Sequence, residues 1–496
     1  MGLLVRDAGH KMGGLNMGAR LGDGQATALG PVLLPLLFVE FVSGALQVYF
    51  MPLYGEIGQR FGVDSATMSW TLTGWILATV VAIPLVAKLG DVYGHRTVLR
   101  VDVALVAIGT ILVAAAPNFA VLLLGRILQG ALAAFLPLMF GLIKVRFAPD
   151  DTRRAVARLS SIVLFGAMAG SVAVGLFTKY GTGAIWALWL PAVGTVVGFA
   201  ALWVVPPAAR HVRPTEARID WLGALILAAG MALTILGISE GPQWGWSSLA
   251  ILGCLTGGII LLLVWGATAL HVAHPLIDLR HLLHRSTAPI YVIGAAVYAA
   301  FLGGQYAIAT YMALPKAVGG LGLTPAAIGL AVLPAVFAAA GLSAAATSLI
   351  GRIIGYPCAL VLGSGIAAAG FAGIVLWHRS VVAFAVLFAF AAVGNGIIAT
   401  APRAMVVARM KPEETGIGSG LYELSITTGA ALGSAIAAAV LAANTAPHQL
   451  LPAPHGYVVV WELATVLCLI AVGAGTALAL YLRRQRSLLS AATVAI

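Results

Sequence analysis

Four charged side chains lie well inside long apolar stretches of this sequence: Glu40, Arg126, Glu423 and Glu462. A charge inside a membrane-spanning helix costs free energy, so such residues usually have a function. A carboxylate that moves between dry, ion-paired and hydrated surroundings binds and releases a proton. The four charges therefore predict proton-coupled chemistry inside an apolar bundle of helices.

Glu40 is the first candidate for the proton site because it lies near the middle of its predicted helix. Ser43 follows one turn later and shares the same helix face. A static ion pair between Glu40 and Arg126 is the alternative. Glu423 is the second candidate, because the glycines around it favour a close-packed helix that borders a cavity. Glu462 lies near the predicted outer end of its helix, where it could simply reach interfacial water.

Apolar segments long enough to span a membrane must position these charges. Hydrophobic residues make up 61% of the chain, charged residues only 9%, and the mean hydropathy is +1.01. A soluble domain carries about 25% charged residues. Windows of about 19 residues predict fourteen helices. They cover residues 31–53, 67–87, 98–116, 120–143, 159–178, 184–205, 221–239, 248–269, 287–314, 325–349, 357–377, 380–402, 416–443 and 457–482. The sequence thus predicts an all-α polytopic membrane protein.

The distribution of basic residues predicts the orientation of these helices. With the amino terminus in the cytoplasm, 23 of the 28 Lys and Arg residues fall in cytoplasmic segments, four in outer segments, and Arg126 inside a helix. This asymmetry follows the positive-inside rule. An even number of helices places both termini in the cytoplasm, with tails at residues 1–30 and 483–496.

A repeated turn predicts that the chain has two related halves. Residues 89–94 and 350–355 are both Gly-x-x-x-Gly turns, after the second and tenth predicted helices. A spacing of eight helices fits two six-helix bundles separated by two inserted helices. The expected domains are bundles at 31–205 and 287–482, inserted helices with a flanking loop at 206–269, and a cytoplasmic linker at 270–286. Parallel repeats place a substrate at their interface, near the middle of the membrane.

Several function classes lack their required motifs. The chain has no Gly-Lys-Ser/Thr phosphate loop, no His-Glu-x-x-His motif, and no evident pair of nucleophile and base. Its three cysteines lie in apolar stretches without disulfide or metal-ligand spacing. His271/His274 and His281/His284 could share helix faces, but no cysteine accompanies them. We therefore expect no enzyme activity, cofactor, metal or nucleic-acid partner, and an ion gradient as the energy source.

The segment between the second and third predicted helices resembles motif A of the major facilitator superfamily. Its matching residues are Gly90, Asp91, Gly94, Arg96 and Arg100. The two glycines permit a tight turn. Asp91 can cap the following structure, or pair with Arg96 or with a neighbouring helix end. In that family the loop latches one conformation of the transport cycle, and the resemblance implies the same role here.

Further segments extend the resemblance over nearly the whole chain. Residues 124–130, which include Arg126 and Gln129, resemble motif B of the same family. Residues 219–223 and 237–246 resemble the seventh helix of the fourteen-helix drug:proton antiporters, and residues 275–280 resemble the loop before their ninth. The resemblance implies a major facilitator fold in which Arg126 and Gln129 serve proton coupling or substrate binding.

The match to motif C is incomplete. Gly166, Gly170 and Gly175 remain on a close-packing helix face. Ser171 replaces the family's proline and Val174 replaces one glycine, so the helix lacks the bend that proline imposes. Strict antiport is therefore less firmly implied than the fold.

The first helix also departs from the family pattern. Alignment on Pro52 places Ser43 where these antiporters usually have an aspartate. Glu40 lies one turn earlier on the same face. We infer that Glu40 supplies the missing carboxylate and that Ser43 lies beside it.

Aromatic residues could line an apolar pocket for flat or cationic substrates. The candidates are Tyr49, Trp75, Tyr298, Tyr306 and Tyr311.

These features together predict a proton-coupled efflux transporter, an antiporter that moves hydrophobic small molecules, cationic ones included, by alternating access. The substrate class rests on the resemblance alone. The expected setting is a bacterial plasma membrane, with substrate, protons and membrane lipid as partners and a monomeric chain. One alternative is an exporter of a lipid or of a self-made natural product. Another is a non-transporting membrane receptor or sensor on the same fold.

Overall fold

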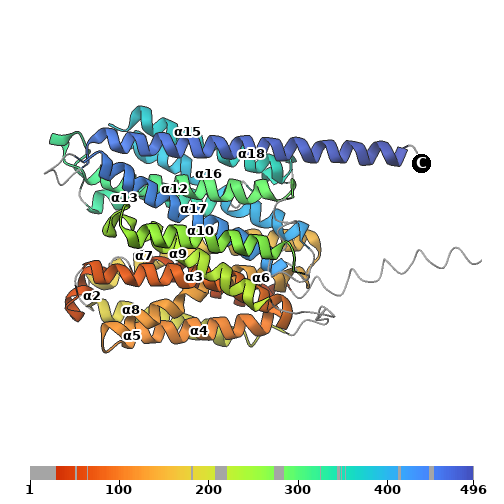
Figure 1. Cartoon of the computed structure of the whole chain (residues 1–496), viewed down its shortest axis with the longest axis horizontal. Helices are drawn as coiled ribbons and strands as arrows, with labels where there is room; N and C mark the ends of the chain where they lie inside the picture. Colours follow the sequence, from red (N-terminus) through yellow and green to blue (C-terminus); the bar gives the residue numbers. More distant parts are fainter. Residues whose placement is uncertain are drawn as a thin grey trace, which may run out of the picture.

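The computed structural model is a bundle of long α-helices that run roughly along one axis (Figure 1). It describes residues 29–50, 53–63, 65–179, 183–206, 220–272, 284–323, 325–342, 347, 349–351, 353–410, 415–445 and 452–494. None of these described residues forms a β-strand. The predicted all-α class therefore holds for this part of the chain.

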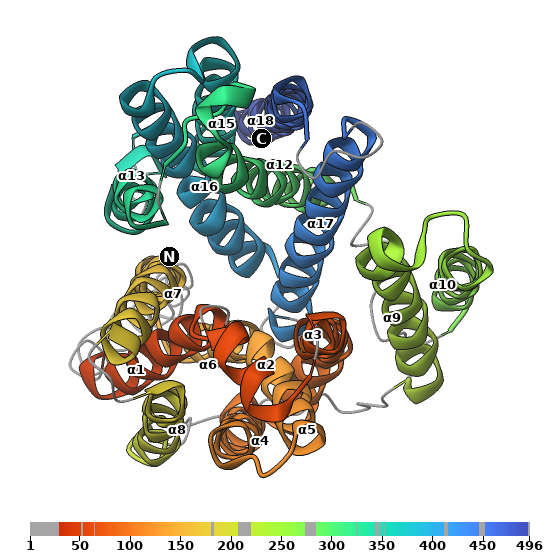
Figure 2. The same ribbon diagram turned by 90° about the vertical axis from the view of Figure 1, so that its left-hand side faces the viewer.

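The first helices of the chain gather in one group (Figure 2). They are α1 (Leu29–Val48), α2 (Tyr54–Phe61), α3 (Ser65–Tyr93), α4 (His95–Ala115), α5 (Phe119–Gln129), α6 (Phe135–Lys144), α7 (Pro149–Lys179) and α8 (Gly183–Ala201). A 3-10 turn, η3 (Gly130–Ala134), joins α5 to α6. The single helix predicted over 120–143 is therefore interrupted at Gly130. We call this set the first group.

The last helices form a second group on the other side of the bundle (Figure 2). They are α12 (Ala288–Ala313), α13 (Pro325–Phe337), α15 (Tyr356–Trp377), α16 (Val381–Arg409), α17 (Thr415–Ala443) and α18 (Pro454–Val494). Two short elements accompany them: η4 (Lys316–Val318), and the π-helical η5 (Ala338–Leu342) after α13. We call this set the second group.

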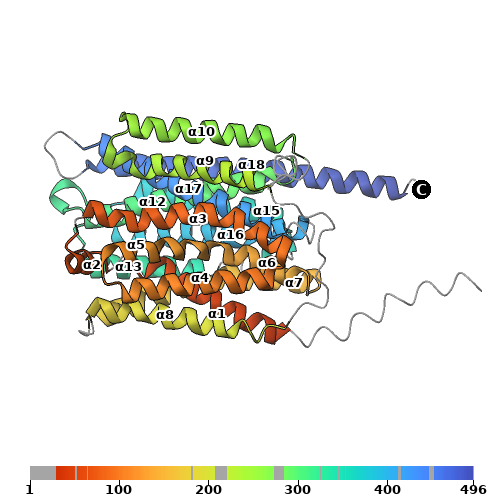
Figure 3. The same cartoon turned by 60° about the horizontal axis from the view of Figure 1, so that its bottom comes forward.

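Helices α9 (Trp221–Trp244) and α10 (Leu249–Ala269) pack against each other beside the two groups (Figures 2 and 3). Their contact is close at Gly258, where an added Cβ would lie 2.9 Å from the Gly230 carbonyl oxygen. Small residues permit such an approach of two helix backbones.

Twelve helical segments of the described residues are long and apolar enough to cross a membrane. They comprise α1, α3, α4, α5 with α6, α7, α9, α10, α12, α15, α16, α17 and α18. Helix α8 adds a shorter apolar stretch, Trp186–Ala201. The count of twelve supports a polytopic membrane protein, while the predicted count of fourteen stays a prediction.

Several helices run past their predicted ends, and three of them matter for the site or for the predicted tail. Helix α9 continues from 239 to Trp244, α16 from 402 to Arg409, and α18 from 482 to Val494. Hydropathy falls at the first polar residues, but backbone hydrogen bonding continues until a capping residue or a chain reversal stops it. Residues 483–494, predicted as a tail, therefore extend α18 beyond the bundle (Figure 1).

The two groups repeat the same local features. Gly94 precedes α4 as its N-cap with φ +97°, and Gly355 precedes α15 as its N-cap with φ +90°, a backbone region that favours glycine. An added Cβ at Gly166 would lie 1.9 Å from the Phe41 carbonyl oxygen, so α7 and α1 are in backbone contact. A Cβ added at Gly433 would likewise lie 2.0 Å from the Ala299 carbonyl oxygen, so α17 and α12 are also in backbone contact.

Candidate substrate and proton site

A cavity of about 700 Å³ lies between the two groups. Its walls come from α1, α3, η3, α6, α7, α9, α12, α16 and α17. Four charged side chains line it: Glu40, Glu240, Arg403 and Glu423. Most of the remaining wall is apolar, as expected of a site for lipophilic small molecules.

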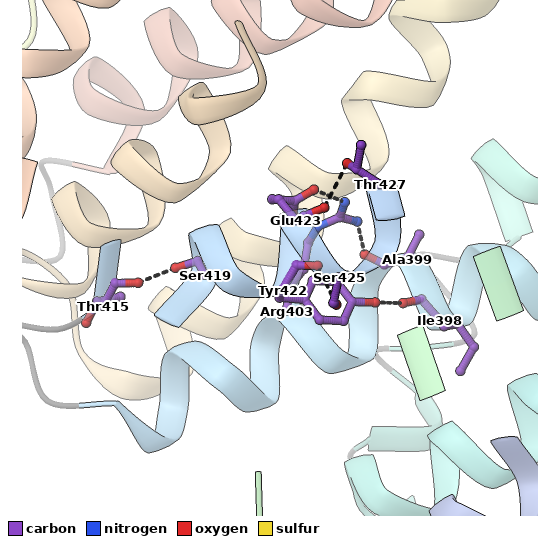
Figure 4. A network of polar contacts seen from close by, with 9 residues as sticks. All are labelled: Ile398, Ala399, Arg403, Thr415, Ser419, Tyr422, Glu423, Ser425 and Thr427. Carbon is purple, nitrogen blue, oxygen red and sulfur yellow. Dashed lines mark hydrogen bonds and ion pairs between the residues drawn. The ribbon is translucent and has the colours of Figure 1, made fainter. Parts of the chain in front are cut away.

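Arg403 and Glu423 form a two-point ion pair that joins α16 to α17 (Figure 4). The Arg403 Nε donates to Glu423 Oε1 at 2.6 Å, and Nη2 donates to Oε2 at 2.9 Å. Arg403 also donates to the Ala399 carbonyl, and the Tyr422 hydroxyl donates to the Ile398 carbonyl at 2.7 Å. Both charged side chains are buried, so each depends on the other for compensation.

Glu40 lies beside this ion pair without belonging to it. Its side chain is 2% exposed, and its charge interacts with those of Glu423 and Arg403. Ser43 is next to it on α1, and Oε2 has no hydrogen-bond partner among the described residues. The alternative ion pair with Arg126 is not formed in the described structure. Glu40 can therefore gain or lose a proton without breaking the Arg403–Glu423 pair.

Arg126 and Gln129 form a second network next to the cavity. Arg126 donates to Gln129 Oε1 at 2.7 Å, and Gln129 Nε2 donates to Tyr49 Oη at 3.1 Å. The Arg126 guanidinium lies 4.5 Å from the Phe50 ring centroid and 5.7 Å from that of Trp75. Trp75 lines the cavity, whereas Arg126 and Gln129 lie behind it. The structure thus separates these two residues from Glu40, Ser43 and Glu423.

Motif A joins the two groups at one end of the bundle. Asp91 accepts hydrogen bonds from the backbone N–H groups of Gly416 and Ile417, each at 3.0 Å. It also contacts His95 Nε2 at 2.9 Å. A carboxylate at a helix N-terminus satisfies free N–H groups and favours the helix dipole. We call this end, defined by Asp91, Gly416 and Ile417, the latch end.

A second contact closes the latch end. Lys144, the last residue of α6, donates to the carbonyl oxygens of Val407 and Met410 at the end of α16. Basic side chains near a helix C-terminus satisfy its free carbonyls. At the opposite end, the lining of the cavity reaches the last turns of α1 and α9, at Gln47 and Gln243. The cavity therefore extends away from the latch end.

The remaining motif A residues act within the first group. Arg100 donates to the Leu202 carbonyl at 3.0 Å and lies 4.2 Å from the Trp203 ring centroid, so it ties α4 to the segment after α8. Gly90 has Leu138 in close contact, 2.3 Å from the position an added Cβ would take. Arg96 does not pair with Asp91, which uses the neighbouring helix end instead.

A family model described as Major Facilitator Superfamily matches residues 36–378. The chain belongs to this superfamily. It is accordingly a multi-pass membrane transporter and not an enzyme.

Known proteins of this superfamily resemble the transporter at modest identity. It is 26% identical over 282 residues to the uncharacterized MFS-type transporter YhcA of Bacillus subtilis, covering 57% of this chain and 52% of the relative. It is 25% identical over 400 residues to the tetracenomycin C resistance and export protein of Streptomyces glaucescens, covering 78% of this chain and 71% of the relative. The first match thus spans about half of the relative's length.

A solved structure supports the fold. The human organic anion transporter MFSD10 superposes with a TM-score of 0.63 at 13% identity, covering 90% of this chain and 99% of that one. At this identity the similarity concerns the fold alone.

Three buried charges of the transporter were not among the predicted site residues. Arg403 and Glu240 lie one residue beyond the predicted spans that end at 402 and 239, so neither was counted among the charges inside the bundle. Asp102 is buried in α4, and neither carboxylate oxygen has a hydrogen-bond partner among the described residues. A search that included charges within one turn of each predicted end would have found all three.

Other predicted residues lie outside the cavity or outside the described contacts. Glu462 is exposed on α18 and does not line the cavity. Gly170 packs against Ala45 of α1, while the surroundings of Gly175 are not among the described features. The pairs His271/His274 and His281/His284 lie mostly in the undescribed segment 273–283, so the metal alternative falls outside the described residues.

The predicted aromatic pocket is present only in part. Trp75 and Tyr298 line the cavity, joined by Phe301. Tyr311 lies instead in an aromatic cluster of the second group, with its ring centroid 5.2 Å from that of Trp461. Tyr49 belongs to the Gln129 network, and the side chain of Tyr306 is not described.

Proposed function

We propose that this transporter is a proton-coupled antiporter that exports hydrophobic small molecules, cationic ones included, from a bacterial cell. The observation that carries the proposal is Glu40, a buried carboxylate beside the Arg403–Glu423 pair in the central cavity, with one oxygen that has no hydrogen-bond partner in the described part of the chain. Such a group can bind a proton on one side of the membrane and release it on the other. The resistance and export names of several relatives support the direction of transport.

The proposed arrangement has fourteen spans with both termini in the cytoplasm. Six-helix bundles then correspond to α1–α8 and α12–α18, with α9 and α10 inserted between them in the sequence. The positive-inside rule places the latch end in the cytoplasm. In this orientation the cavity faces outward, and the contacts of Asp91 and Lys144 hold the cytoplasmic side closed.

Alternating access would proceed by breaking those contacts while the two bundles rock about the cavity. In the outward-facing state Glu40 takes up a proton from outside as the substrate leaves. When the cavity opens to the cytoplasm, the next substrate enters and Glu40 releases its proton there. One carboxyl group thereby couples inward proton movement to outward substrate movement, and the Arg403–Glu423 pair sets the local field.

Substrate-induced proton release in proteoliposomes tests this proposal. We expect Glu40→Gln to abolish substrate-driven proton release, because an amide cannot carry the proton. Glu423→Gln should weaken it, because Arg403 then loses its counter-charge and its field acts on Glu40 alone. Glu462→Gln is the matched control, since that residue is exposed on α18 and should leave coupling unchanged. Unaltered coupling in Glu40→Gln would refute the assignment.

Export of a self-made natural product is the second candidate. Two relatives carry such names: the tetracenomycin C export protein and the probable actinorhodin transporter of Streptomyces coelicolor, the latter 28% identical over 322 residues. Vesicle assays with tetracenomycin C, actinorhodin, lipids and cationic dyes would separate the substrate classes. Absence of flux for every class, with no pH dependence, would favour the receptor alternative.

A further inference from the structure

Helix α9 closes one side of the cavity by packing on both groups. Ile235 belongs to a buried cluster with Val80 and Ile83 of α3 and Leu424 of α17. Toward the latch end, Leu227 shares a second cluster with Ile417 of α17. Figure 2 shows α9 next to α3 and α17, with α10 outside it. The inserted helices therefore form part of the wall around the cavity.

One carboxylate of α9 enters that wall. Glu240 is 1% exposed and lines the cavity, and its Oε1 accepts a hydrogen bond from Thr73 Oγ1 of α3 at 2.8 Å. No basic side chain of the described residues forms an ion pair with it. A hydroxyl donor stabilises a carboxylate but leaves its charge uncompensated, and buried charges need a partner.

Of the other two carboxylates that line the cavity, only Glu423 is paired with a cation among the described residues. Glu423 is held by Arg403 at two points, and Glu40 lies in the field of that pair. With Glu40 and Glu240 ionised, the four charged side chains carry an excess of negative charge. A positively charged group entering from the open end would therefore find two carboxylates, Glu40 and Glu240, without a cation among the described residues.

Depth separates Glu240 from the proposed proton site. Glu240 lies four residues before the end of α9, or about 6 Å along the helix. Glu40 lies eight residues before the end of α1, or about 12 Å. Both helix ends lie away from the latch end, so Glu240 is the outer of the two carboxylates. Trp75, two residues after Thr73 on α3, also lines the cavity, and an aromatic ring can offer a flat surface to a lipophilic cation.

We propose that Glu240 binds the positive charge of cationic amphiphilic substrates, so that the inserted pair α9–α10 contributes directly to the substrate site. Thr73 holds the carboxylate in position from α3. The inference rests on the proposed efflux function and adds a substrate-binding residue that is distinct from the proton carrier. Neutral substrates occupy the same apolar cavity without using Glu240.

Binding of two probes of similar shape tests this assignment. Tetraphenylphosphonium carries a permanent positive charge, and triphenylphosphine oxide is neutral. For the purified full-length transporter we expect Glu240→Gln to weaken tetraphenylphosphonium binding by about tenfold or more, the loss typical of a charged contact, and to leave triphenylphosphine oxide binding unchanged. Glu240→Asp should retain part of the preference for the cation.

Two further variants make the result specific. Thr73→Val should reduce tetraphenylphosphonium binding less than Glu240→Gln, because it removes only the positioning donor. Glu462→Gln should change neither affinity. Equal loss of both probes in Glu240→Gln would show that the residue only supports the wall, and an unchanged preference for the cation would also overturn the proposal.

The outcome can be separated from that of the efflux proposal. If wild type binds tetraphenylphosphonium through Glu240 but shows no proton-coupled flux, the proton mechanism fails and the binding assignment stands. If wild type couples proton release to a neutral substrate but does not bind tetraphenylphosphonium, the assignment of Glu240 fails and the efflux proposal stands.

Discussion

At the scale of single residues, the cavity depends on how each charge is compensated. Glu423 stands out in the sequence as an acid within an apolar helix, but its chemistry follows from Arg403 on the neighbouring helix. Distances between helices are not encoded in hydropathy or in local spacing. The acids could therefore be predicted as candidates, whereas the pairing of Glu423 and the isolation of Glu40 could not.

The Arg403–Glu423 pair makes a stability prediction. Arg403→Gln should lower the free energy of unfolding by about 3–5 kcal/mol, because it leaves the buried Glu423 charge without its partner. The double variant Arg403→Gln with Glu423→Gln should recover much of this loss, since two neutral amides can hydrogen-bond to each other. Thermal unfolding in detergent measures both. If the double variant melts below the single one, the ion pair does not explain the stability.

At the scale of the helices, the sequence predicted the existence of most elements but not their ends. The predicted span 416–443 matches α17 closely, because both ends adjoin polar residues. The predicted ends at 239 and 402 lie before the true ends of α9 and α16. These two errors left Glu240 and Arg403 out of the predicted site. The glycine motif Gly166–Gly170 was predicted to mark close packing, and the structure places α1 directly against it.

Close packing of α1 on α7 predicts a steric effect. Gly166→Ala should destabilise the transporter by roughly 1–3 kcal/mol, because the added methyl group would overlap the Phe41 carbonyl. Gly473→Ala is the control, since an added Cβ there meets nothing within 4 Å and alanine is the better helix former. Comparison of the two melting temperatures in detergent checks the prediction. Equal melting temperatures would contradict it.

At the scale of the whole molecule, two polar contacts hold the latch end together. Motif A indicated a latch, and Asp91 was expected to pair with Arg96 or with a helix end. The structure selects the helix end, formed by residues more than 300 positions later in the chain. No pattern within the motif indicates that partner, because it depends on the packing of the two groups. Lys144 entered the sequence analysis only as one of the 23 basic residues counted in cytoplasmic segments.

The latch predicts a shift in conformation. Asp91→Asn should open the latch end more often, by a few-fold in population, because it removes a charge worth roughly 0.3–1 kcal/mol at the N-terminus of α17. Asp220→Asn is the matched control, since Asp220 caps α9 through Gly223 N at 2.7 Å without joining the two groups.

Spin labels can measure this shift. Ala157 of α7 and Ala408 of α16 both line a groove between the groups at the latch end. Labels on cysteines placed there, in a background without the three native cysteines, report the separation of the groups. A longer distance should gain population in Asp91→Asn only. The same distribution in both Asn variants would argue against a latch.

The position of α9 makes the transporter unequal on its two lipid-facing sides. Where α3 meets α17, a third helix lies across the boundary between the groups, backed by α10 (Figure 2). On the opposite side, Leu164 of α7 packs directly against the core of the second group. Among the described residues, the boundary between the groups is therefore covered by an additional helix pair on one side and not on the other. For compounds already dissolved in the membrane, lateral entry would be directional, although the two halves repeat the same local features.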